Sequence, residues 1–156
     1  MLKWITLILG IALATPSFAE ETGELTAVLD SEDVTLVLLA SQSDHRGSSS
    51  FGSVSMVFSA DGAAGINLIF VGFEFRDGAA AVRDIRLVAQ DRSMYFPRKD
   101  DSFILEVDEA TKTGEFLTVK GRMHFIADFS KDFGRTLDPS MSHEIDGTFE
   151  VVVGPV

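Results

Sequence analysis

Apolar and polar positions alternate with a period of two along most of this chain, the pattern typical of β-strands with one buried face. The alternation is clear at residues 116–129 and 144–153, whereas residues 66–76 form the most apolar segment, with apolar side chains on both faces. Within residues 144–153, Ile145, Phe149 and Val151 share a face, which we predict to be buried. Residues 34–40 instead form a nearly continuous apolar run, as expected of a strand covered on both faces.

Turn-forming residues separate these segments at regular intervals. Short polar turns are expected at residues 30–33, 77–78 and 108–115. Longer polar loops are expected at residues 41–50, 91–102 and 130–142. Eight or nine short strands spaced in this way predict an all-β fold, an antiparallel β-sandwich. A small closed β-barrel is the alternative.

Two glycines occupy equivalent places on apolar strand faces. Residues 119–123 and 145–149 share the order apolar, charged, glycine, polar, apolar, with Gly121 and Gly147 at the centres. A glycine here leaves a gap in which a neighbouring aromatic ring can lie, and it permits the strand to bend. We therefore interpret the pair as shaping a curved sheet, with a ligand groove over the glycines as the alternative.

The first 19 residues have the features of a secretory signal peptide. Lys3 supplies the positive charge, residues 5–13 are mostly apolar, and Ser17-Phe18-Ala19 places small residues at the cleavage positions. The apolar run is shorter than the roughly 20 residues that span a bilayer. We expect an exported protein, periplasmic or secreted, whose single domain comprises residues 20–156 and which keeps no membrane anchor after cleavage.

Composition limits the chemistry that this domain can carry. The chain has no cysteine, which excludes disulfides, thiol catalysis and cysteine-ligated metal centres. Its formal net charge of -11 makes nucleic acids and anionic membrane surfaces unlikely partners, because both repel an acidic surface. Such acidity favours solubility, and secondarily the recruitment of cations or a basic partner.

No arrangement of histidines or serines has the spacing of a catalytic or metal site. His124 and His143 lie on segments that could pair, so they could approach one another, with Asp128 or Asp132 nearby. His45 lies in a serine-rich stretch that lacks the G-x-S-x-G motif, and we interpret that stretch as a flexible linker. We expect no catalytic residue, no metal ligand and no cofactor.

One cluster combines aromatic and basic residues on an otherwise acidic chain. It consists of Arg92, Tyr95, Phe96, Arg98 and Lys99. Exposed aromatics flanked by cations are typical of partner-binding surfaces. The alternative is a turn whose aromatic side chains pack under the edge of the sheet.

These observations predict a non-enzymatic binding or accessory domain whose partner is an unknown protein or small ligand. A small barrel that carries an apolar ligand is a second possibility, suggested by the 13 phenylalanines, although a core of this size needs most of them. A metal- or serine-dependent hydrolase is a third, without a supporting motif.

Overall fold

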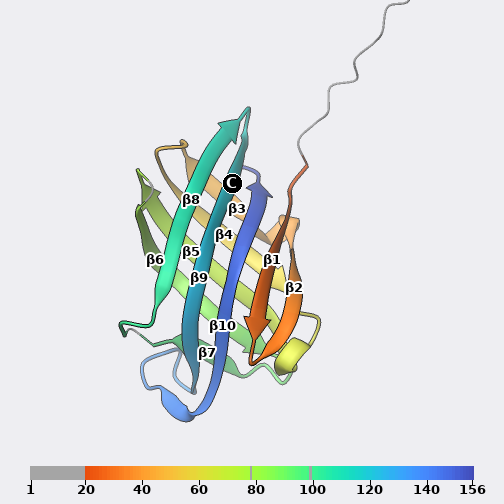
Figure 1. The fold of residues 1–156 in the computed structure, drawn as a ribbon, viewed down its shortest axis with the longest axis vertical. Helices are drawn as coiled ribbons and strands as arrows, with labels where there is room; N and C mark the ends of the chain where they lie inside the picture. The colour runs from red at the N-terminus through yellow and green to blue at the C-terminus, as the bar shows by residue number, and fades with distance from the viewer. Residues whose placement is uncertain (1–19, 78, 99) are drawn as a thin grey trace, which may run out of the picture.

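The computed structural model describes residues 20–77, 79–98 and 100–156, so the expected signal peptide lies outside the described residues. Within them, ten strands form an antiparallel β-sandwich (Figure 1). The strands are β1 (Thr22–Leu29), β2 (Glu32–Leu38), β3 (Asp44–Gly47), β4 (Phe51–Ser59), β5 (Ile66–Arg76), β6 (Ala79–Ala89), β7 (Met94–Pro97), β8 (Ile104–Thr113), β9 (Phe116–Ser130) and β10 (Asp138–Val153). Two single 3₁₀ turns, at Ala40–Gln42 and Ala63–Gly65, complete the fold.

The prediction of an all-β antiparallel sandwich is confirmed. One layer has the order β8-β9-β10-β1-β2, and the other contains β3, β4, β5 and β6, whose strands run obliquely behind it in Figure 1. The layers join at two corners. At one, β2 pairs with β4 only through Val37–Ser59 and Leu38–Phe58. At the other, the short strand β7 pairs with both β6 and β9. Because strand pairing at these corners is so short, the strands do not form a regular closed barrel.

Ten strands rather than eight or nine are present because two short strands lie where the sequence predicted loops. β3 lies within residues 41–50, and β7 lies within residues 91–102. Both are polar or proline-containing segments that become strands by pairing with a longer neighbour, β4 or β9. For the same reason β8 continues to Thr113 through an expected turn, and β10 begins at Asp138 within an expected loop.

The core lies between the two layers and follows the predicted faces, except on β2, which was expected to be covered on both faces but has one face exposed, with Val37 54% exposed. On β10, Ile145, Phe149, Val151 and Val153 are all buried, as the alternation predicts. The ring of Phe73 packs against those of Phe75 and Phe149 at centroid distances of 6.5 and 6.3 Å. These phenylalanines therefore fill the interior.

Among the described residues, the structure has no helix whose length and apolar character would suit it to cross a membrane.

Candidate functional site

The side groove

Strand β7 is short because the chain leaves the sheet at its end. β7 pairs with β9 over its four residues but with β6 only at Met94 and Tyr95, and after Pro97 the backbone N–H of Arg98 still donates to the backbone oxygen of Ile126 on β9. The chain then turns outward at Asp100, whose carboxylate accepts hydrogen bonds from the backbone N–H and the hydroxyl of Ser102. This departure leaves the flank of the sandwich open between β6 and the segment that leads into β8.

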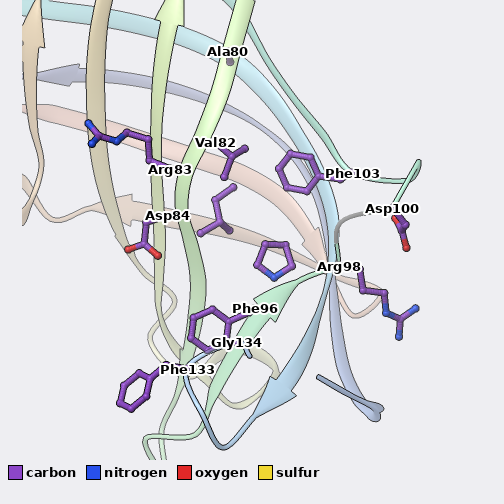
Figure 2. A pocket seen from close by; sticks show the side chains of 12 residues that line it. Ala80, Val82, Arg83, Asp84, Phe96, Arg98, Asp100, Phe103, Phe133 and Gly134 are labelled. Atoms are coloured by element: carbon purple, nitrogen blue, oxygen red, sulfur yellow. The ribbon is translucent and has the colours of Figure 1, made fainter. Parts of the chain in front are cut away.

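The opening is a groove with a volume of about 690 Å³, which we call the side groove. Figure 2 shows Val82 of β6 pointing toward Phe103, with the ring of Phe96 beside Gly134 at the lower end. Its apolar walls consist of Ala80, Val82, Ile85, Phe96, Pro97 and Phe103. This volume falls within the range of roughly 300–1,000 Å³ typical of small-molecule pockets.

The charged side chains at the groove point away from its apolar centre. Figure 2 shows Arg83 and Asp84 on one side and Arg98 and Asp100 on the other. On β6, Arg83 pairs with Glu74 at 3.2 Å. Asp84 pairs with Arg86 at 3.1 Å. These pairs leave an apolar centre between compensated charges.

Arg98 forms the shortest of these interactions, a bidentate ion pair with Asp128. Its Nε and Nη2 atoms donate to the two carboxylate oxygens at 2.7 and 2.8 Å. Asp128 is only 2% exposed, and its hydrogen bond from Arg98 raises the pKa of the guanidinium. Arg98 therefore neutralises a buried carboxylate and ties the end of β7 to β9.

A rigid loop between β9 and β10 forms the lower rim of the side groove. Asp132 accepts hydrogen bonds from the backbone N–H and the hydroxyl of Thr136, both at 2.8 Å, and the hydroxyl of Ser130 accepts one from the N–H of Gly134. The hydrogen bonds from Thr136 lower the pKa of Asp132, its backbone N–H most of all, and the hydroxyl of Ser130 adds to the effect. At the tip, Phe133 has a positive φ of 58° and is 75% exposed.

Gly134 is required where the loop meets the groove. Its φ is +82°, and a Cβ atom there would lie 3.0 Å from the ring of Phe96. Glycine tolerates both the left-handed conformation and the close approach of the ring. The result is an exposed aromatic side chain, Phe133, held at the edge of an apolar groove.

Placement of the residues singled out from sequence

The structure separates the two aromatic residues of the predicted contact cluster. Tyr95 packs against Phe129 at a ring-centroid distance of 5.8 Å and against His143 at 4.5 Å. It is half-buried, and burial raises the pKa of its phenol, helped by the negative charges of Asp91 and Asp30. Phe96 lines the side groove instead.

The basic members of the cluster also have different places. Arg92 lies exposed in the β6–β7 turn with a positive φ of 70°. Arg98 holds Asp128, as described above, and Lys99 lies outside the described residues. Of the five predicted contact residues, Phe96 and Arg98 therefore line the groove.

The three histidines have separate partners. The Nδ1 atom of His143 lies 2.5 Å from Asp30 Oδ2, and Asp30 Oδ1 accepts the backbone N–H of Glu144. His124 lies 4.0 Å from Glu144. Neither Asp128, bound to Arg98, nor Asp132, bound to Thr136, joins them.

The Asp30–His143 pair has the form of the orienting half of a catalytic pair, in which a carboxylate fixes one ring nitrogen. A hydrolase also needs a nucleophile beside the other nitrogen. In the part of the chain that the structure describes, no serine or threonine hydroxyl forms a hydrogen bond with His143. The pair ties the β1–β2 turn to β10 and, with Tyr95, closes this end of the core.

The interpretation of residues 41–50 as a flexible linker is wrong. His45 lies in β3, is 2% exposed, and its Nε2 atom lies 2.7 Å from the backbone oxygen of Glu115. The ring therefore connects the β3–β4 layer to the β8–β9 turn, while its buried Nδ1 atom has no hydrogen-bond partner. Pairing of β3 with β4 orders the segment despite its polar composition.

Sequence reasoning missed the groove residues on β6 and in the β9–β10 loop. Val82, Phe103 and Phe133 come from three separate segments that only the fold brings together. One local signal was present in residues 79–82, an uncharged Ala-Ala-Ala-Val run that directly follows a turn. Phe133 is likewise a lone aromatic residue in a polar loop.

Among the residues that the structure describes, no group of three or more His, Asp or Glu side chains is arranged to hold a metal ion. No protein-family model, no curated protein and no solved structure matches this chain.

Proposed function

We propose that this protein is a non-enzymatic binding domain that takes an apolar group into the side groove. The groove between Val82 and Phe103 carries this proposal, because it combines an apolar centre with charges on β6 that pair within the chain. Ligand pockets typically have such mostly apolar walls with a few polar groups at the margin. The exposed ring of Phe133 extends the apolar surface beyond the rim.

The domain acts outside the cytoplasm in this proposal, since residues 1–19 have the features of a signal peptide. The sequence suggested an apolar ligand inside a small barrel; we retain the apolar ligand but propose a different place for it. The buried phenylalanines pack against one another in the core, so the ligand site is placed at the flank.

An uncharged dye tests the proposal without knowledge of the natural ligand. N-phenyl-1-naphthylamine fluoresces strongly when it enters an apolar site, and its lack of charge avoids repulsion by the acidic surface. The dye should bind the wild-type protein, and Val82→Gln should weaken binding by about fivefold or more, the effect of losing roughly 1 kcal/mol.

Val28→Gln is the matched control. Val28 is 43% exposed against 41% for Val82, but it lies on β1, away from the groove. Dye binding that both substitutions reduce equally, or that neither affects, would contradict the proposal.

A further inference from the structure

The side groove runs along a strand edge that has no partner. β7 pairs with β6 only at Leu87 and Val88, while β5 pairs with the whole length of β6. In the described chain, residues 79–86 therefore have a strand on one side only. Unpaired N–H and C=O groups along such an edge form a template for an added strand.

The first four residues of this edge carry no side chain that blocks pairing, whereas Arg83, Asp84 and Arg86 farther along it are charged. Residues 79–82 are three alanines and a valine, whereas proteins usually protect edges with charges, proline or bulges. β8 offers the contrast, since it pairs only with β9 and carries Glu106, Asp108 and Glu109. The one irregularity of β6 lies beyond the alanines, where its register shifts between Val82 and Asp84.

An extended polypeptide can use both the apolar groove and the unpaired backbone edge of β6, whereas a small apolar molecule can use only the groove. Alternate side chains of an added strand point to the same face about 7 Å apart, so apolar residues at every second position can enter the groove beside Val82 and Phe103. Its main chain can pair with the edge of β6. A small apolar molecule would leave that edge unpaired.

Charge decides between the possible polypeptide partners. Arg83, Asp84 and Arg98 beside the groove are compensated by Glu74, Arg86 and Asp128, and the carboxylate of Asp100 is hydrogen-bonded to Ser102. The chain as a whole has a formal charge of -11, so it attracts basic flanks and repels a second copy of itself.

We infer that the side groove binds an extended segment of another protein, apolar at alternate positions and basic at its ends, which adds as a strand to the free edge of β6. This inference rests on the proposed function and names the class of ligand for the same site.

The probe is the synthetic peptide acetyl-Lys-Val-Thr-Val-Thr-Val-Lys-amide, titrated against the full mature protein at low salt. One control peptide carries N-methyl groups on all its valines and threonines, which removes the N–H donors on both edges of the strand but keeps the side chains. A second has glutamate in place of both lysines. The parent peptide should bind at least about tenfold more tightly than either control. Val82→Gln should weaken its binding, and Val28→Gln should not, with circular dichroism showing that both variants fold.

The outcomes separate this inference from the proposed function. If the dye binds but the peptide does not, or if the N-methylated peptide binds equally well, strand addition is refuted while the apolar site stands. If neither dye nor peptide binds, both proposals fail. A wild-type dimer that Val82→Gln dissociates, measured by analytical ultracentrifugation, would make a second copy the occupant and overturn the inference.

Discussion

Replacing Phe149 with alanine should destabilise this domain strongly, because its ring occupies the centre of the core. Phe149 is 2% exposed and packs against Phe73 at a centroid distance of 6.3 Å. Its ring also covers Gly121 on the neighbouring strand, where a Cβ atom would lie 2.6 Å from Phe149 Cζ. The gap that the sequence predicted over Gly121 is therefore filled by this ring.

The magnitude follows from the buried area. An aromatic side chain buries roughly 150–250 Å², which at about 25 cal/mol per Å² corresponds to roughly 4–6 kcal/mol. Alanine keeps its own Cβ, so a loss of about 3–5 kcal/mol is expected, as for other buried phenylalanines. Domains of this size have unfolding free energies of roughly 5–15 kcal/mol. The melting temperature should fall by roughly 10–20 °C.

Thermal unfolding followed by circular dichroism measures the change, and Glu150→Ala is the control. The Glu150 side chain is 65% exposed and pairs with Lys120 across the outer face, so its loss should barely alter the melting temperature. Equal melting temperatures for wild type and Phe149→Ala would refute the packing argument.

Three further predictions concern processing, the groove wall and the β9–β10 loop. N-terminal sequencing of protein recovered from its host should begin at Glu20, and a mature protein that retains Met1 would contradict export by cleavage. Arg98→Met should destabilise the fold in denaturant titration more than the double change Arg98→Met/Asp128→Leu. The reason is that the single change leaves a buried carboxylate without its cation. Equal losses of unfolding free energy would show that Asp128 does not need its cation. The hydrogen bonds to Asp132 lower its pKa, so its carboxylate stabilises the folded state above the ordinary value of 3.8 and this contribution is lost as the pH falls through the lowered pKa. Asp132→Asn should therefore flatten the decline of stability in that acidic range, and an unchanged acid profile would count against the loop network.

The alternation of apolar and polar residues determined the fold class and the buried face of the long strands. β10 shows this most clearly, since Ile145, Phe149 and Val151 are buried as predicted. Successive side chains of a strand point to opposite faces, so a period of two identifies the face that is buried in the core. This inference does not require knowing which strands lie next to it. The role of Gly121 followed from the same pattern.

Only the tertiary structure decided the short strands and the candidate site. β3 and β7 are strands because β4 and β9 offer backbone partners, a long-range effect that local composition does not encode. The side groove exists because β7 stops pairing with β6 after Tyr95, which leaves Val82 and Phe103 to line an open flank. The free edge of β6 is likewise defined by which strands do not pair with it, and pairing is a property of the whole fold.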